Sequence, residues 1–436
     1  MRRGFRKIIL AGQRLLASTS ALPPFRRLLS VQTARKLSNV ASDDADQPET
    51  PRQLLVDVST IAQNDAGTGI QRVVREILKQ LLENPPSGYE VRPVHASRSH
   101  AYRYADRYRS SLMGGAPGNA PSRPVRVRSG DVFLALDLTS HILPRRHFQI
   151  SRWKARGARI YFTIYDLLPV LRPEWFIPAE VKAHENWLRS MAIYADGAIC
   201  ISRSVSNELK RWLKNQYGEL EPPVTVGWFH LGSDTFSSIP DSYQRNAVPL
   251  LVRLRTGSFI LMTGTLEPRK GYAQALSAFE LLWSRGKNVN LVIVGRPGWK
   301  VDALLRRLRE HPEAGKRVHW LESASDHMLR DLYAASDGLL MTSEGEGFGL
   351  PLIEAACYGK PILARNIPVF REVAGDHARY FSGNTPEGLA AEIGEWLELI
   401  KRNQAITSTG IRPQSWRESA EQLLSNIGPL KVPAGR

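Results

Sequence analysis

The most informative stretch of this sequence is residues 343–355, which read SEGEGFGLPLIEA. An apolar, strand-like run precedes this stretch, and a helix is expected to follow over Leu350–Tyr358. Pro351 stands near the first helical position, where the missing N–H is not needed. Unpaired N–H groups and the helix dipole make such a helix start an anion site. Gly347 and Gly349 let the backbone approach a ligand closely, so the turn predicts a diphosphate site.

Two carboxylates accompany this turn. Glu346 lies in the loop before the helix, and Glu354 lies about one turn inside it. We expect both side chains to face the same ligand, because they flank the same helix start. Carboxylates accept hydrogen bonds from vicinal hydroxyls, so one is expected to hold a donor sugar and the other a ribose.

The second half of the chain alternates strands with helices. Strands are expected over Phe259–Thr263, Asn290–Val294, Val318–Leu321, Gly338–Met341 and Pro361–Ala364. Helices are expected over or within Tyr272–Arg285, Val301–His311, Asp326–Ala335 and Leu350–Tyr358. This alternation predicts a parallel sheet with both faces covered.

The first half follows the same pattern less clearly. Leu54–Val58 predicts a strand, which leads through the loop residues Gly67, Thr68 and Gly69 into an amphipathic helix. Residues 87–128 are expected to include a long loop. Further buried strands are expected over Val132–Leu136, Ile160–Ile164, Ala198–Ile201 and Val224–Val226. The predicted fold class is therefore α/β, with two Rossmann-like domains that face each other across a cleft.

Three motifs together resemble a known family. Glu346 and Glu354 match the E-x7-E signature of glycosyltransferase family 4, which comprises retaining enzymes of the GT-B fold. Residues 264–271 read GTLEPRKG and resemble the family loop whose basic residue grips the donor pyrophosphate. This version of the loop looks most like that of bacterial mannosyltransferases of surface-polysaccharide assembly. Residues 67–69 resemble the family loop that approaches the donor phosphates.

The resemblance implies specific site residues. Lys270 is the best match for the phosphate-binding cation, and Arg269 is a second candidate. The expected catalytic residues are Glu346, Lys270, Arg269 and Asp166. The expected donor-binding residues are Gly67, Thr68, Gly69, Gly264, Thr265, Gly347, Phe348, Gly349, Leu350 and Glu354. The amides at the helix start would stabilise the charge of the departing diphosphate. No Asp-x-Asp motif stands out, and the GT-B enzymes that the sequence resembles need no divalent ion, so the resemblance implies neither a metal nor another cofactor.

Two positions depart from the family pattern. Many relatives carry a His-Asp pair after a central strand of the first domain, but here Tyr165 precedes Asp166. Asp166 is therefore either a residue that points into the cleft or the cap of a turn. Thr265 occupies a place where relatives often carry arginine, which shifts phosphate neutralisation toward Lys270, Arg269 and backbone amides.

The charge balance bears on partners. The chain has 436 residues and a formal net charge of +17, and residues 1–42 carry nine positive and no negative charges. That segment is interpreted as a contact with an anionic membrane surface, a targeting segment or a disordered tail. No nucleic-acid-binding motif is present, so nucleic acid is not an expected partner. A cytoplasmic enzyme, peripheral on the inner face of a membrane, is expected.

The predicted organisation has four parts. Residues 1–52 form a basic extension and linker, 53–245 an acceptor domain, 246–395 a donor domain, and 396–436 a helical segment that crosses back to the acceptor domain. The predicted function is retaining transfer of a hexose, with mannose from GDP-mannose favoured, to a saccharide or lipid-linked saccharide. The alternatives are nucleotide-sugar binding without turnover and another GT-B reaction, such as epimerisation of a UDP-sugar.

Overall fold

The computed structural model describes residues 31–36, 51–116, 122–233, 254 and 257–428. These residues divide between two compact units. The first unit comprises Met1–Leu171, Pro178–His230 and Trp416–Arg436, and the second comprises Arg172–Ile177 and Leu231–Ser415. Most of the basic extension and linker expected over residues 1–52, and the domain boundary expected between residues 245 and 246, lie outside the described residues.

The first unit is built on a seven-stranded sheet in the order β3-β2-β1-β4-β5-β6-β7. Every neighbouring pair is parallel except β2 and β3. Its strands are β1 (Arg52–Asp57), β2 (Tyr89–His95), β3 (Arg103–Tyr104), β4 (Val132–Ala135), β5 (Arg159–Ile164), β6 (Gly197–Cys200) and β7 (Thr225–Trp228). Its helices are α3 (Gly69–Glu83), α4 (Asp106–Leu112), α5 (His147–Lys154), α6 (Leu168–Leu171), α7 (Pro178–Tyr194), α8 (Arg203–Tyr217) and α16 (Trp416–Asn426).

The stretch 87–128, expected to include a long loop, also contains β2, β3 and α4, while the described residues between Leu112 and Val132 form no helix or strand. In β2, the buried Tyr89 and Val91 alternate with the partly exposed Glu90 and Arg92, and the buried pair Pro93 and Val94 then breaks the alternation. Arg92 nevertheless lies in a favourable place, since its guanidinium stacks 4.2 Å from the centre of the Tyr104 ring. The charged residues of this partly solvated strand therefore interrupt the apolar pattern from which a strand is predicted.

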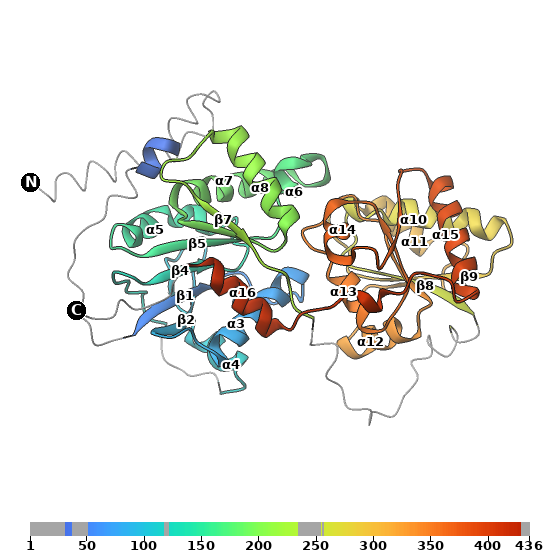
Figure 1. The fold of residues 1–436 in the computed structure, drawn as a ribbon, viewed down its shortest axis with the longest axis horizontal. Coiled ribbons are helices and arrows are strands. Elements are labelled where there is room, and N and C mark those ends of the chain that lie inside the picture. Colours follow the sequence, from blue (N-terminus) through green and yellow to red (C-terminus); the bar gives the residue numbers. More distant parts are fainter. Residues whose placement is uncertain (1–30, 37–50, 117–121, 234–253, 255–256, 429–436) are drawn as a thin grey trace, which may run out of the picture. The chain divides into compact units, whose positions relative to one another are not determined.

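The last described helix belongs to the first unit. Helix α16 packs beside α3 and β7 (Figure 1). Asn426 donates a hydrogen bond from Nδ2 to the carbonyl of Trp228 at 3.0 Å, and Ser419 donates from Oγ to the carbonyl of His230 at 2.7 Å. A Cβ atom at Gly227 would lie 1.9 Å from Oδ1 of Asn426, so a larger residue at this position would have to displace the Asn426 side chain.

Part of the basic N-terminal segment also lies in the first unit. Residues 31–36 are helical, and Arg35 is only 1% exposed. Its guanidinium donates hydrogen bonds to the carbonyls at the end of α7, Ala192 at 3.0 Å and Ala195 at 2.8 Å. It also donates to the carbonyls of Pro222 and Pro223. The helix thereby joins the end of α7 to the segment before β7.

The second unit holds a six-stranded, fully parallel sheet in the order β10-β9-β8-β11-β12-β13. Its strands are β8 (Ser258–Thr263), β9 (Val289–Val294), β10 (Val318–Leu321), β11 (Gly338–Met341), β12 (Ile362–Arg365) and β13 (Arg379–Phe381). Its helices are α10 (Tyr272–Ser284), α11 (Asp302–Arg309), α12 (Asp326–Ala335), α13 (Leu350–Cys357), α14 (Pro368–Ala374) and α15 (Pro386–Lys401).

This strand order is that of a Rossmann domain, in which chain direction across the sheet reverses between the first and fourth strands. Here those strands are β8 and β11, which are direct neighbours. Ligands in such sheets bind outside the carboxyl ends of the strands at the reversal. The loop after β8 contains Gly264 and Lys270, and the loop after β11 contains Glu346. The prediction of two Rossmann-like α/β domains is confirmed.

Candidate active site

The loop after β8 is shaped by glycines at close contacts. Gly264 has a φ of +126° and accepts a hydrogen bond at its carbonyl from the Tyr272 hydroxyl at 2.7 Å. Gly271 has a φ of +71° and begins α10. A Cβ atom at Gly271 would lie 2.6 Å from the carbonyl oxygen of Thr342, in the loop after β11. The two loops of the predicted donor site are therefore in contact at this glycine.

Polar contacts fasten the two loops together. Thr342 donates a hydrogen bond from Oγ1 to the carbonyl of Lys270 at 2.7 Å. The amide of Glu344 donates to the carbonyl of Arg269 at 2.8 Å. These two hydrogen bonds, both donated by the segment after β11, hold the short 3-10 turn Pro268–Lys270 against that segment.

Three of the predicted catalytic side chains meet between these loops. Lys270 Nζ lies 2.5 Å from Glu346 Oε1, and Arg269 Nη1 lies 2.8 Å from Glu346 Oε2. Arg269 also contacts Glu267, with 2.7 Å between Nε and Oε2. The side chains of Glu346, Lys270 and Arg269 are only 8%, 13% and 14% exposed. Glu267 is the member of this cluster that the sequence analysis missed.

The electrostatics of the cluster favour a charged Glu346. Burial alone would raise the pKa of Glu346, but attraction by Lys270 and Arg269 outweighs burial and lowers this pKa from 4.5 to about 2. Ser343 contributes in the same direction through a hydrogen bond. Burial raises the pKa of Glu267, although Arg269 and Lys270 oppose that rise. A cluster of two cations and two carboxylates is the result.

The helix start after β11 has the expected form. Gly349 has a φ of +102° and is the N-cap of α13, and Pro351 lies in its first turn. A Cβ atom at Gly349 would lie 3.0 Å from the Phe370 ring, so space and conformation both favour glycine. Gly347 and Phe348 are buried, whereas Leu350 is partly exposed. Their roles in donor binding stay predictions.

Glu354 has partners of its own. It is 5% exposed, and its Oε2 accepts a hydrogen bond from the Tyr333 hydroxyl at 2.7 Å. Tyr333 comes from α12 and also lies 3.0 Å from Oγ1 of Thr263, the last residue of β8. Tyr333 was not among the predicted residues, because it is 21 residues away in sequence from Glu354. Only the fold reveals that it orients this carboxylate.

The predicted glycine loop of the first unit has a clear local role. Thr68 is the N-cap of α3, and Gln71 completes a capping box with it. Gly67 has a φ of +64°, and a Cβ atom there would meet nothing within 4 Å. Thr68 and Gly69 are exposed. Helix capping and a left-handed backbone therefore explain Thr68 and Gly67, while contact with donor phosphates stays a prediction.

Asp166 and Tyr165 have different surroundings. Asp166 Oδ1 accepts a hydrogen bond from the amide of Leu168 at 3.0 Å, at the start of α6. Tyr165 is 4% exposed and donates to the carbonyl of Leu136 at 2.8 Å. The tyrosine is therefore a packed residue of the first unit. The pKa of Glu208 in α8 is raised by burial first and by the charge of Asp166 second.

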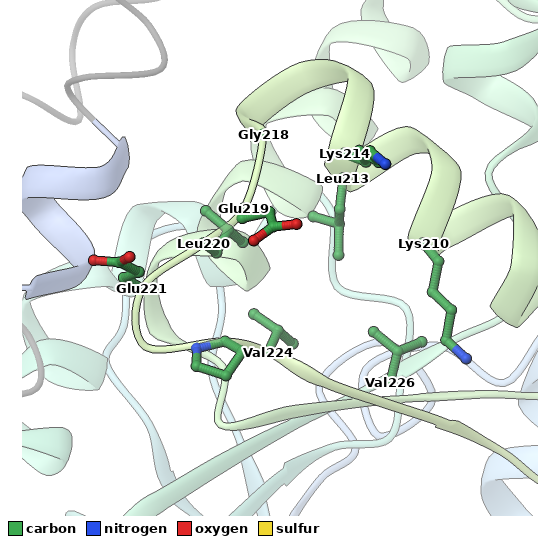
Figure 2. A pocket seen from close by; sticks show the side chains of 10 residues that line it. Lys210, Leu213, Lys214, Gly218, Glu219, Leu220, Glu221, Val224 and Val226 are labelled. Carbon is green, nitrogen blue, oxygen red and sulfur yellow. The ribbon is translucent and has the colours of Figure 1, made fainter.

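A pocket of about 420 Å³ is also present in the first unit, away from all of these residues. Figure 2 shows Lys210 and Lys214 of α8 beside an apolar lining that includes Leu213, Val224 and Val226. None of the residues predicted for catalysis or donor binding lines this pocket.

The strand order of the second sheet defines an α/β domain of the Rossmann class. Residues 253–412 match the profile of the family Glycosyl transferases group 1. Residues 253–412 therefore form a domain of this family, and the fold of the chain is GT-B.

Curated relatives match either most of the chain or part of it. It is 45% identical over 388 residues to the serotype-specific mannosyltransferase WbdA of Escherichia coli, covering 88% of this chain and 46% of WbdA. It is 30% identical over 174 residues to the O-antigen chain mannosyltransferase B of Escherichia coli, covering 38% of this chain and 45% of that protein. The chain thus spans about half the length of these curated relatives.

Solved structures support the fold. The structure of HepE from Anabaena, determined in complex with UDP and glucose, matches with a TM-score of 0.59 at 17% identity. The match covers 86% of this chain and 99% of HepE. The sequence-based resemblance to glycosyltransferases of the GT-B fold is therefore confirmed.

Proposed function

We propose that the chain is a retaining glycosyltransferase that transfers mannose from GDP-mannose to a saccharide or lipid-linked saccharide. The observation that carries this proposal is the cluster of Lys270, Arg269 and Glu346, buried between two loops at the reversal point of the second sheet. Sheets of this kind bind nucleotides at that point.

The donor diphosphate would lie against the start of α13. The amides of Phe348, Gly349 and Leu350 and the ammonium of Lys270 would neutralise its charge. Glu346 would accept hydrogen bonds from the sugar hydroxyls, and Glu354 from the ribose hydroxyls. Tyr333 supports this role, because its hydrogen bond fixes one oxygen of Glu354.

The reaction exchanges one bond at the anomeric carbon for another. The bond between this carbon and the phosphate oxygen breaks, and the nucleoside diphosphate leaves with the electron pair. The acceptor hydroxyl oxygen bonds to the same face of the carbon, and its proton passes to the departing phosphate oxygen. Lys270 and the helix-start amides stabilise the charge that develops on this phosphate. The anomeric configuration is retained.

The choice of donor rests on the relatives. Both E. coli proteins described above are named mannosyltransferases. The GTLEPRKG loop, which resembles that of mannosyltransferases, agrees with GDP-mannose as the donor. No metal has a part in the proposed reaction, so added EDTA should leave the rate unchanged.

The proposed location of the acceptor is inferred from the net charge of the chain. The net charge of +17 suits an acceptor carried on an anionic membrane surface on the cytoplasmic side. Among the described residues, no helix is both long and apolar enough to cross a membrane. Recovery of activity with anionic vesicles that carry the acceptor, above that with neutral vesicles, would support a peripheral association.

A donor panel tests the proposal. The purified protein is offered GDP-mannose, UDP-glucose, UDP-N-acetylglucosamine and ADP-glucose with mannoside and glycolipid acceptors, and products are detected by mass spectrometry. We expect a mannosylated product from GDP-mannose. Lys270→Ala and Glu346→Ala should lose turnover, and Glu354→Ala should lose donor affinity. Binding without product, or conversion of a UDP-sugar without an acceptor, would contradict the proposal.

A further inference from the structure

Arg269 has contacts that differ in kind from those of Lys270. Its guanidinium bridges two carboxylates, Glu267 through Nε at 2.7 Å and Glu346 through Nη1 at 2.8 Å. Nη1 also donates to the carbonyl of Gly345 at 2.8 Å. The planar fork of an arginine suits such fixed, multiple contacts. Its side chain therefore binds the glycine-rich loop itself.

Lys270 is placed differently. Its ammonium contacts Glu346 Oε1, and it lies over Gly264, where a Cβ atom would be 3.6 Å from Nζ. An ammonium is a compact charge on a flexible chain, which can exchange one anionic partner for another. Gly264 is partly exposed and has a left-handed φ, and as a glycine it places no side chain of its own between Lys270 and a ligand at the loop.

The charges of the cluster explain why both cations are needed. Glu267, Glu346, Arg269 and Lys270 together carry no net charge when all are ionised. If Lys270 turns to a diphosphate, Glu346 and Glu267 are left with Arg269 as their shared counter-ion. An unpaired carboxylate at 8% exposure would be costly.

We propose that Arg269 is a positioning residue that holds the Glu346 carboxylate and the Gly345 carbonyl in place while Lys270 moves to the donor diphosphate. Arg269 does not itself bind phosphate. This inference rests on the proposed function, and it revises the catalytic role that the sequence suggested for Arg269.

The test compares nucleotide binding with turnover. Affinity for GDP and for UDP is measured by calorimetry for the wild type, Lys270→Met, Arg269→Met and Arg269→Lys, with Arg306→Met on the exposed face of α11 as control. We expect Lys270→Met to weaken binding of the preferred nucleotide about 30-fold, and Arg269→Met less than about 3-fold. Arg269→Met should nevertheless lower kcat for mannosyl transfer about 100-fold.

Two further readouts separate positioning from a general loss of folding. In Arg269→Met, the acidic limb of the kcat profile should move to higher pH, because Glu346 loses the cation that stays beside its carboxylate once Lys270 has moved to the diphosphate. Arg269→Lys should restore part of kcat, since it keeps the charge but not the fork. If Arg269→Met does not fold, Arg269→Lys alone tests the positioning role of Arg269. We then expect kcat to fall about 10-fold while the affinity for GDP stays unchanged.

Each contrary result has a distinct meaning. Equal weakening of nucleotide binding by Arg269→Met and Lys270→Met would overturn the positioning role and make Arg269 a phosphate ligand. Unchanged kcat in Arg269→Met would overturn it as well. Absence of saturable GDP and UDP binding by the wild type would overturn the proposed function, and this inference with it.

Discussion

Neutralising Glu346 without changing its shape should destabilise the second unit. Glu346→Gln keeps the side-chain volume but removes the charge that pairs with Lys270 and Arg269. The pKa of Glu346 is lowered from 4.5 to about 2, because its two cations outweigh the effect of burial. At about 1.4 kcal/mol for each pKa unit, the ionised carboxylate contributes roughly 3 kcal/mol at pH 7.

The sign of the pH dependence follows from the lowered pKa. The contribution of Glu346 is fully present above pH 4.5, the ordinary value for the unfolded chain, and is lost as the pH falls toward about 2. Wild-type stability should therefore fall between pH 5 and pH 3 by more than that of Glu346→Gln. At pH 7, the variant should be less stable by about 3 kcal/mol.

The assay must report on the second unit alone, since the chain has two units. Urea unfolding followed by hydrogen exchange in peptides from β8 to β12 meets this need. Glu310→Gln, at an exposed position after α11, is the matched control and should change stability by less than about 0.5 kcal/mol. Equal stability of Glu346→Gln and wild type at pH 7 would refute the reasoning.

Three other substitutions test separate parts of the fold. Gly271→Ala should lower the free energy of unfolding of the second unit in urea by about 3 kcal/mol, since its Cβ would lie 2.6 Å from a backbone oxygen. Gly286→Ala, with a similar φ and open space around the Cβ, should lower it by only about 1 kcal/mol. Arg35→Met should destabilise the first unit by about 3 kcal/mol, because Arg35 is buried. Lys36→Met, at an exposed position, should leave the stability almost unchanged, and equal effects of the two substitutions would contradict a role for the buried Arg35 hydrogen bonds. Burial raises the pKa of Asp57 from 3.8 to about 7, so its stabilising contribution is complete below pH 3.8 and lost as the pH rises through 7. The free energy of unfolding of the first unit should fall from pH 5 to pH 8 in the wild type, and it should fall less in Asp57→Asn. Parallel pH profiles of the two proteins would contradict the raised pKa of Asp57.

Much of the second unit could be predicted from sequence, because its strands are short apolar runs that alternate with helices. The expected strands Val318–Leu321 and Gly338–Met341 match β10 and β11 residue for residue. The glycine positions were informative for a physical reason, since Gly264, Gly271 and Gly349 all adopt positive φ. The first unit was harder, because Glu90 and Arg92 interrupt the apolar pattern of β2.

Contacts between distant residues could not be predicted. Glu267 lies three residues before Lys270, but nothing in the sequence shows that Arg269 would bridge it to Glu346. Tyr333 reaches Glu354 only because α12 and α13 are neighbours around β11. The basic composition of residues 1–42 gave no sign that Arg35 is buried, because charge patterns predict solvated surfaces. Such side-chain partners are set by tertiary packing.

The central claim is that a diphosphate-linked sugar binds where the loops after β8 and β11 meet. Hydrogen–deuterium exchange with and without saturating GDP-mannose tests this most directly. We expect slower exchange at the amides of residues 264–271 and 344–350, lost in Lys270→Met. Protection confined to another region, such as the pocket beside α8, or no change in these two loops, would contradict the claim.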